Sequence, residues 1–324
     1  MCQDQHSIYM RRCIELALKG RLHAAPNPMV GAVIVHGERI IGEGFHTCCG
    51  MPHAEVNAIH SVREADRPLL HDSTLYVSLE PCAHYGRTPP CALLIQRTGI
   101  PRVVIGCVDP FAKVAGRGIS MLREAGVEVT VGVLEEECKW LNRRFVTAQT
   151  LHRPYVTLKW ALSADGFIDR WRDDDAEPAA RLSTEASLMH VHALRATHSA
   201  ILVGHRTLCI DHPALNVRHW VGPQPQPVVL GRVAEDELPR GWRAYADIDT
   251  MMHDLHKAGC QSLLVEGGTQ TLQSFIDRGL WDEAYTELSP QLLQSGVPGP
   301  RMPVGVTARC ETAFGAHLLH YTNA

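Results

Sequence analysis

The sequence lacks an excess of either charge, a long apolar run and a recognisable leader. Lysine and arginine number 31 against 35 acidic residues, and this net charge of −4 argues against a basic nucleic-acid-binding surface. No uninterrupted apolar stretch approaches the ~18–20 residues that a membrane-spanning helix needs. Residues 1–12 contain neither an apolar segment nor a small-residue cleavage site. We therefore expect a cytoplasmic protein with no membrane and no nucleic-acid partner.

A disulfide framework is also missing, although cysteine is not scarce. The chain has 11 cysteines, an odd number without the spacing of a small disulfide-rich scaffold, and most of them lie in the first half. We interpret Cys13, Cys107 and Cys138 as small apolar core residues, and the adjacent Cys48 and Cys49 as structural. A metal site, if the chain has one, is therefore predicted in the first half.

The order of predicted elements indicates two α/β domains, residues 1–150 and 151–324, each large enough for its own core. Strand-like apolar runs alternate with helical periodicity, which is typical of a parallel or mixed sheet covered on both faces. A single helix over residues 134–150 is expected to connect the domains. The charged run 170–178 is predicted to be a solvated loop.

Three short motifs in the first half suggest a catalytic metal site. His53 and Glu55 open a predicted helix, Cys82 follows a predicted strand, and Cys91 begins the next helix. One imidazole and two thiolates supply three zinc ligands and leave a position for water, while a glutamate two residues from the histidine can move protons. This is the arrangement of zinc nucleobase deaminases, whose two cysteines are more closely spaced. A structural zinc site or two unrelated thiols are the alternative interpretations.

The second half carries a weaker signal by itself. Residues 265–269 (VEGGT) lie between a predicted strand and a predicted helix. Backbone N–H groups at such a glycine turn can bind a phosphate group, but the pattern is not the dinucleotide-binding fingerprint. On these residues alone, the second half is an α/β domain with a possible anion site.

Longer stretches of sequence resemble a known family, the bifunctional deaminase/reductases of riboflavin biosynthesis. The first half has PNP at 26–28, HAEVNA at 53–58, EPCAHYGRTPPC at 80–91, VAGRG at 114–118 and LNRRF at 141–145. The second half has AILVG at 200–204, PALNVR at 213–218 and VEGG at 265–268. The resemblance implies a cytidine-deaminase-like three-layer domain followed by a dihydrofolate-reductase-like α/β domain. It also implies deamination of a diaminopyrimidine ribosyl phosphate, then reduction of the ribosyl side chain to ribityl.

The resemblance further implies residue roles and two cofactors, Zn²⁺ and NADPH. In the first half, His53, Cys82 and Cys91 match the zinc ligands and Glu55 matches the proton shuttle. The expected contacts of the deaminase substrate are Asn27, His46, His84 and Arg87. The expected contacts of the reductase substrate are Lys159, Arg195, Leu215, Arg218 and Glu266. The expected cofactor-binding residues are Thr207, Asp211, Gly267, Gly268 and Thr269. We expect small-molecule substrates and a homo-oligomer.

The chain departs from the family pattern at two places in the second half. Residues 181–183 read Arg-Leu-Ser where the family has Trp-Ile-Thr or Trp-Ile-Ser, and residues 230–232 read Leu-Gly-Arg where a strand commonly ends in Ile-Asp-Ser. Two alternatives therefore stay open: a deaminase with a weakened reductase half, and a second domain that binds a nucleotide without catalysis. Nucleic-acid deamination is disfavoured by the acidic balance and by the insertion between the cysteines.

Overall fold

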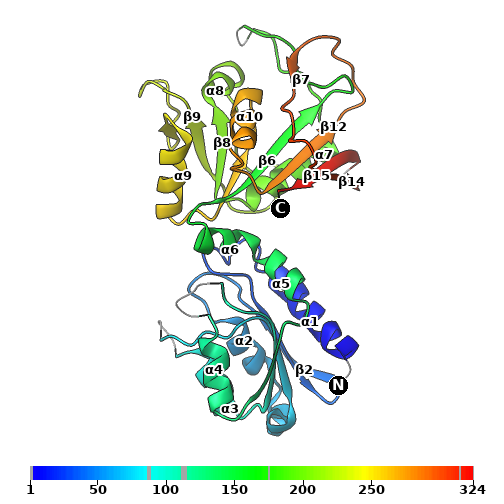
Figure 1. Ribbon diagram of the computed structural model, residues 1–324, viewed down its shortest axis with the longest axis vertical. Coiled ribbons are helices and arrows are strands. Elements are labelled where there is room, and N and C mark those ends of the chain that lie inside the picture. Colours follow the sequence, from blue (N-terminus) through cyan, green and yellow to red (C-terminus); the bar gives the residue numbers. More distant parts are fainter. Residues whose placement is uncertain (1–2, 86–88, 111–114, 174–175, 314, 324) are drawn as a thin grey trace. The chain divides into compact units, whose positions relative to one another are not determined.

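The computed structural model describes residues 3–85, 89–110, 115–173, 176–313 and 315–323. The chain divides into two compact units, Met1–Leu151 and His152–Ala324, and each has its own sheet and apolar core (Figure 1). Within the described ranges, none of the helices combines the length and the apolar character needed to cross a membrane. The α/β class predicted for both halves is confirmed.

The first unit is built on a five-stranded mixed sheet with the order β2-β1-β3-β4-β5. β1 pairs antiparallel with β2 and β3, whereas β3, β4 and β5 run parallel. The strands are β1 (Gly31–His36), β2 (Arg39–Phe45), β3 (Thr74–Leu79), β4 (Arg102–Cys107) and β5 (Glu128–Val131). The helices are α1 (Gln3–Leu18), α2 (Ala54–Ser61), the 3₁₀ helix η1 (Glu64–Asp72), α3 (Cys91–Thr98), α4 (Arg117–Glu124), α5 (Glu135–Leu141) and α6 (Arg143–Thr150).

Two apolar clusters sandwich this sheet and make the unit three-layered. On one face, α2, α3 and α4 bury side chains such as Ile95 and Leu122 against Ile34 of β1. On the other face, α1 and α5 bury Met10 and Cys138 against the sheet. All six residues of β3 are buried, because both faces of this central strand are covered. The three-layer architecture predicted for the first domain is therefore confirmed.

The predicted single helix over residues 134–150 is wrong, because α5 and α6 are separate and meet at Asn142. The Asn142 amide accepts a hydrogen bond from Met29 N at 2.8 Å and donates one to Met29 O at 2.9 Å. Its side chain is 3% exposed, and its φ of −104° departs from helical values. A buried asparagine that pairs with a distant backbone thus ends one helix and starts the next.

The second unit contains an eight-stranded sheet with the order β10-β9-β8-β11-β6-β12-β15-β14. The six strands from β10 to β12 run parallel, and the C-terminal strands β15 and β14 add an antiparallel hairpin. The strands are β6 (Tyr155–Leu162), β8 (Ala200–Gly204), β9 (Gln226–Leu230), β10 (Arg243–Tyr245), β11 (Ser262–Val265), β12 (Glu283–Leu288), β14 (Ala308–Ala313) and β15 (Ala316–Thr322). β7 (Phe167–Asp169) pairs separately with β13 (Val297–Pro298).

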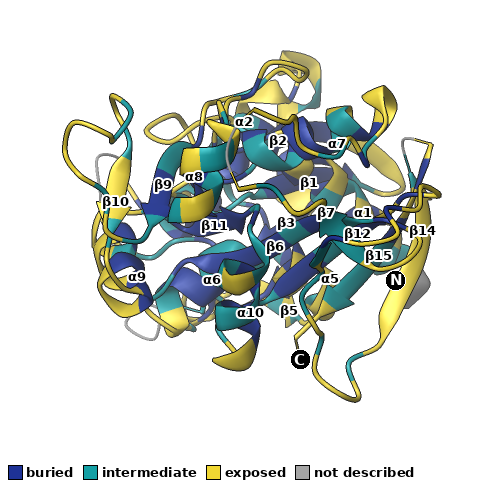
Figure 2. Ribbon diagram, turned by 90° about the horizontal axis from the view of Figure 1, so that it is seen from above, coloured by how far each residue is buried: buried dark blue, intermediate teal, exposed yellow. Residues whose placement is uncertain are grey.

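Helices cover both faces of the second sheet and leave its edges exposed. The helices are α7 (Glu185–Ala196), α8 (His205–Asp211), α9 (Ile248–Lys257) and α10 (Thr269–Asp277). Met251 of α9 and Phe275 of α10 pack on one face, while Leu194 of α7 packs with Ile201 and Leu264 on the other. Figure 2 shows the edge strands β10 and β14 as exposed, in contrast to the inner strands. Because β8 and β11 run parallel, the β8–α8 and β11–α10 turns lie together at the carboxyl end of these strands.

Candidate active sites

Three predicted zinc ligands come together in the first unit because three elements start or end at the same edge of its sheet. His53 is the N-terminal capping residue of α2, Cys82 lies three residues beyond the end of β3, and Cys91 is the first residue of α3. Two backbone hydrogen bonds join the cysteine segments: Cys91 N donates to Cys82 Sγ at 3.3 Å, and Ala92 N donates to Cys82 O at 3.2 Å. The two segments that flank the insertion are thus hydrogen-bonded to each other.

The distances among these side chains fit a zinc ion. His53 Nδ1 lies 3.6 Å from Cys82 Sγ and 3.4 Å from Cys91 Sγ, and the three atoms lie within 4.8 Å of one another. Zn–N and Zn–S bond lengths of about 2.0–2.1 and 2.3 Å imply a nitrogen–sulfur separation of about 3.6 Å in a tetrahedral site. The donor set of one imidazole and two thiols therefore matches zinc in both chemistry and spacing.

The electrostatics of the cluster favour a thiolate at Cys82. The Cys91 side chain, followed by His53, lowers the pKa of Cys82 to about 4, while the Cys82 sulfur and burial raise that of Cys91. Glu55 lies in the first turn of α2 and is only 3% exposed. Burial, followed by the negative charge on Cys82, raises the pKa of Glu55 to about 7.

Two of the four residues predicted to contact the deaminase substrate lie together beside the metal cluster. His46 is 3% exposed, and its ring lies edge-on to His53 with 5.5 Å between centroids. Asn27 Nδ2 is 3.0 Å from His46 Nε2, and His46 Nδ1 is 3.2 Å from Pro52 O. Burial lowers the pKa of His46, so the neutral ring donates from Nδ1 to Pro52 and accepts from Asn27.

The other two predicted contacts lie on the insertion between the cysteines. His84, two residues beyond Cys82, is exposed to solvent. Arg87 lies outside the described residues. The assignments of both residues stay predictions.

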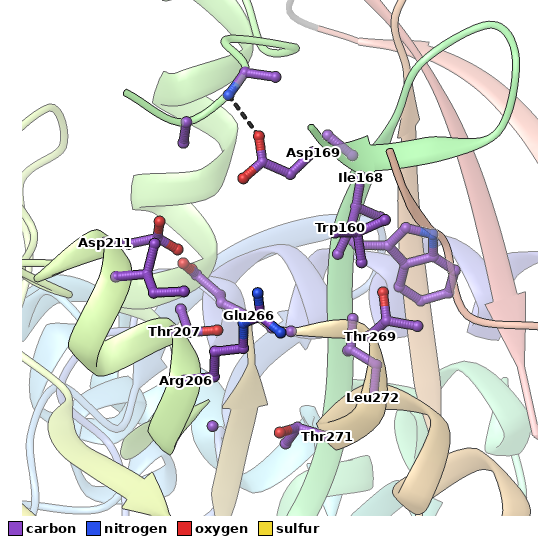
Figure 3. A pocket seen from close by; sticks show the side chains of 18 of the residues that line it. Trp160, Ile168, Asp169, Arg206, Thr207, Asp211, Glu266, Thr269, Thr271 and Leu272 are labelled. Atoms are coloured by element: carbon purple, nitrogen blue, oxygen red, sulfur yellow. Dashed lines mark hydrogen bonds between the residues drawn. The ribbon is translucent and has the colours of Figure 1, made fainter. Parts of the chain in front are cut away.

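A second candidate site is a cavity of about 1020 Å³ in the second unit. Figure 3 shows Asp211 and Thr207 on one side of it, Trp160 and Ile168 on the other, and Glu266 between them. This volume lies at the upper end of the roughly 300–1,000 Å³ typical of ligand sites. Seven of the ten residues predicted for the reductase site line it: Lys159, Thr207, Asp211, Glu266, Gly267, Gly268 and Thr269.

The remaining three predicted reductase residues do not line this cavity. Arg195 forms an ion pair with Glu266 through nitrogen–oxygen distances of 2.6 and 2.8 Å, so it contacts a wall residue. Leu215 is 3% exposed and packs in the apolar cluster around Ile201. Arg218 is exposed and donates to Asn216 Oδ1 at 2.9 Å. Their predicted contacts with substrate therefore stay predictions.

The β11–α10 turn forms the part of the cavity where a phosphate was predicted. Gly267 has a φ of 143°, which side chains rarely adopt, and nothing lies within 4 Å of the place where its Cβ would be. Gly268 caps the N-terminus of α10, and Thr269 Oγ1 donates to Pro298 O at 2.6 Å. The turn thus keeps the cavity open beside the start of a nine-residue helix.

Among the described residues of the cavity wall, Lys159 is the one lysine, and it lies near two carboxylates. Its side chain is 13% exposed, and its Nζ is 3.9 Å from Glu287 Oε2, which also accepts a hydrogen bond from Ser183 Oγ at 2.7 Å. Burial lowers the pKa of Lys159, and the negative charges of Glu266 and Glu287 oppose this shift. A lysine in this setting can give up a proton more readily than one in water.

The prediction of a solvated loop over residues 170–178 is wrong for Arg172. Its side chain is 6% exposed and forms ion pairs with Asp169 and Asp211. Trp171 and Arg181 also line the cavity, whereas Arg232, from the second departure, is not among the lining residues. An arginine in an acidic run directly after a strand was the available signal, but its partner Asp211 lies 39 residues away in the chain.

Comparisons with known proteins agree with this two-part organisation. Residues 3–107 match the cytidine and deoxycytidylate deaminase zinc-binding region, and residues 154–309 match the RibD C-terminal domain. The chain is 35% identical to the riboflavin biosynthesis protein RibD of Aquifex aeolicus, over 92% of this chain and 90% of that protein. It is 36% identical to RibD of Synechocystis, over 94% and 89% of the two chains.

Solved structures show the same similarity over both units. A diaminohydroxyphosphoribosylaminopyrimidine deaminase/5-amino-6-(5-phosphoribosylamino)uracil reductase from Thermotoga maritima superposes with a TM-score of 0.88, at 35% identity and over 99% of both chains. RibD of Acinetobacter baumannii superposes with a TM-score of 0.88, at 30% identity and over 100% of both chains.

Proposed function

Because the chain belongs to the family of the riboflavin biosynthesis protein RibD, we propose that it catalyses two consecutive reactions on one small molecule. The first unit deaminates 2,5-diamino-6-ribosylamino-4(3H)-pyrimidinone 5′-phosphate by zinc-dependent hydrolysis. The second unit reduces the ribosyl side chain of the product to ribityl with NADPH. The observation that carries this proposal is the convergence of His53, Cys82 and Cys91 beside the buried Glu55.

In the deaminase reaction, His53, Cys82 and Cys91 hold the metal, and Glu55 moves protons. A zinc ion bound there supplies Lewis acidity that makes water nucleophilic near neutral pH. The Glu55 carboxylate accepts a proton from the water that attacks the amino-bearing ring carbon, and returns it to the departing nitrogen, so that ammonia leaves. Asn27, oriented by its contact with the neutral His46, presents its carbonyl oxygen to a ring N–H.

In the reductase reaction, the cavity of the second unit holds NADPH beside the substrate, and NADPH supplies the reducing equivalents. The turn at Gly267 and Gly268 admits the diphosphate to backbone N–H groups at the start of α10. The Lys159 ammonium donates a proton to the substrate heteroatom that becomes negative when hydride adds to the adjacent sugar carbon. Arg195, paired with Glu266, holds that carboxylate at the cavity wall.

A second domain without catalysis is not favoured. Lys159 lines the same cavity as the β11–α10 turn, so a proton donor and a phosphate-binding turn adjoin one space. The departure at Arg181 adds a positive charge to the wall and removes none of the residues assigned above. This arrangement supports a working reductase.

We also propose that the protein is a cytoplasmic homo-oligomer. The ten cysteines within the described part of the chain are all free, which is typical of a reducing compartment. Light scattering of the purified protein tests the oligomeric state, and a single-chain mass would contradict it.

The direct test of the proposed function is incubation of the purified protein with the diaminopyrimidine ribosyl phosphate, followed by mass analysis. Without NADPH, we expect the mass change of replacing an amino group by a hydroxyl group, with release of ammonia. With NADPH, we expect a further gain of two hydrogens and consumption of the cofactor. Deamination without NADPH consumption would contradict the assignment of the second unit, and an unchanged substrate would contradict that of the first.

A further inference from the structure

Two consecutive residues in the wall of the second-unit cavity differ sharply in burial. The Arg172 side chain is 6% exposed, whereas Trp171, also a wall residue, is 62% exposed. An exposed tryptophan on the wall of a large cavity offers a flat apolar surface to a ligand. The contacts of the buried Arg172 position the segment that carries this tryptophan.

Arg172 ties the segment after β7 to α8. Its Nη2 lies 2.5 Å from Asp169 Oδ2 and 2.5 Å from Asp211 Oδ1, and its Nη1 donates to Glu177 O at 3.1 Å. Arg206 of α8 in turn donates to Arg172 O at 2.8 Å. The guanidinium therefore joins a carboxylate at the end of β7 to one at the end of α8, with little access to water.

Asp169, the last residue of β7, holds the same segment through its second carboxylate oxygen. Its Oδ1 accepts hydrogen bonds from Arg170 N at 2.9 Å and from Ala180 N at 2.7 Å; the second is the dashed bond in Figure 3. One carboxylate thus fixes the backbone on both sides of Trp171 and Arg172. The two neighbours of Trp171 are therefore both held, Arg170 by a hydrogen bond from its N–H group and Arg172 by its ion pairs.

The order of the strands indicates which end of the cofactor this indole faces. β11 lies between β6, which carries Lys159, and β8, which leads into α8. If the diphosphate binds at the β11–α10 turn and the reacting ring binds beside Lys159, as the proposed function requires, the adenine would lie on the α8 side of that turn. Arg172 pairs with Asp169 at the end of β7 and with Asp211 at the end of α8, so the segment that carries Trp171 is linked to the α8 side of the cavity.

We propose, building on the proposed function, that Trp171 binds NADPH by stacking on its adenine ring, and that Arg172 is the residue that positions it. Stacking of an aromatic side chain on a base contributes about 1–3 kcal/mol by alanine substitution. Both residues belong to the second unit, whereas the metal cluster belongs to the first, so we expect deamination not to depend on them.

The test measures binding of NADPH and of adenosine 2′,5′-bisphosphate, the adenine half of the cofactor, by isothermal titration of the full-length protein. Trp171→Ala should raise the Kd of both ligands about tenfold, and Trp171→Phe, which keeps a flat ring, should restore most of the affinity. Trp220→Ala is the matched control, because Trp220 is 37% exposed in the same unit and is absent from the cavity wall. Arg172→Gln should weaken both ligands, with a larger effect on KM for NADPH than on kcat.

Energy transfer from indole to NADPH gives a second measurement. Because Trp160 also lines the cavity, NADPH emission excited through tryptophan should fall only in part in Trp171→Phe and should be unchanged in Trp220→Phe. Unchanged affinity of Trp171→Ala for both ligands would overturn the proposal. A loss for NADPH without a loss for the bisphosphate would overturn the adenine assignment. Absence of NADPH binding by the wild-type protein would instead overturn the proposed reductase function, so the two failures are distinguishable.

Discussion

At the scale of single residues, the side chain that we propose as the proton shuttle of the deaminase site is separable from the proposed metal ligands. Glu55 lies two residues from His53, but its carboxylate is not part of the three-atom cluster. Glu55→Gln keeps the shape and removes the proton acceptor, so we expect full zinc content with deamination lowered by about 10²-fold or more. Elemental analysis and a deamination assay check this, with Glu64→Gln, an exposed acid of the same unit, as the control. Turnover within twofold of wild type would contradict the role of Glu55.

Substitution of a proposed metal ligand should have a different effect from Glu55→Gln, because it removes the metal as well as the activity. Cys91 is 2% exposed and supplies one of only two sulfur donors, so Cys91→Ser replaces a soft ligand with a hydroxyl that binds zinc weakly. We expect zinc content and deamination to fall together in this variant. The matched control is Cys138→Ser, a buried cysteine of the same unit that lies outside the cluster. Full zinc occupancy with normal deamination in Cys91→Ser would remove that residue from the ligand set.

Lys159 gives the reductase a pH dependence whose direction follows from its surroundings. Burial lowers its pKa from the usual 10.5, while Glu266 and Glu287 oppose the shift. If the ammonium is the proton donor, the reductase rate falls as pH rises through the Lys159 pKa. Glu287→Gln removes one opposing charge and lowers that pKa further, so the alkaline loss of activity should move to lower pH. Rate profiles of wild type, Glu287→Gln and the exposed control Glu235→Gln test this, and a rate that rises with pH would contradict proton donation.

How much of the sites could be predicted from the sequence depended on where the partners lie along the chain. Cys82 and Cys91 are nine residues apart and flank recognisable strand and helix boundaries, so their convergence with His53 was predictable. The pairing of Arg172 with Asp211 spans 39 residues and joins a loop to the end of a helix, and no local pattern indicates it. The apolar packing of Leu215 was likewise hidden, because a single leucine in a polar loop carries no periodicity.

At the scale of elements, apolar runs and boundary residues were enough for most strands but not for the C-terminal edge of the second sheet. β4, β6 and β8 have the bounds expected from their apolar runs, since both faces of a central strand must be apolar. The C-terminal hairpin of β14 and β15 was not predicted, because the residues of β14 are mostly exposed and form no continuous apolar run. The break at Asn142 was missed because its partner, Met29, is 113 residues away.

The β11–α10 turn provides a test at this scale. Gly268 has a φ of −70°, which any residue can adopt, but a Cβ there would lie 3.3 Å from Thr207 Oγ1 at the cavity. Gly268→Val should therefore narrow the cavity and weaken NADPH binding by about tenfold, roughly the effect of one misplaced contact group. Gly268→Ala should show a smaller effect in the same titration. Equal NADPH affinity in wild type and Gly268→Val would remove this turn from the cofactor site.

At the scale of the whole molecule, the two chemistries rest on separate sheets with separate apolar cores. Every side chain assigned to deamination lies before residue 92, and every side chain assigned to reduction lies after residue 158. An ordered pair of reactions can then be divided by mutation, because a substitution in one site changes no contact within the other unit.

Two variants of the intact chain test whether deamination and reduction can be lost independently. Glu55→Gln, supplied directly with the deaminated intermediate, should consume NADPH at the wild-type rate, since its altered carboxylate belongs to the first unit. Gly268→Val should deaminate the diaminopyrimidine at the wild-type rate while its NADPH consumption falls. Far-UV circular dichroism of each variant establishes that both remain folded.

If folded Glu55→Gln failed to reduce the intermediate, the second reaction would require the first site, and the assignment of one reaction to each unit would be wrong. If both variants keep the untouched reaction, the chain carries two separable catalysts, one in each unit.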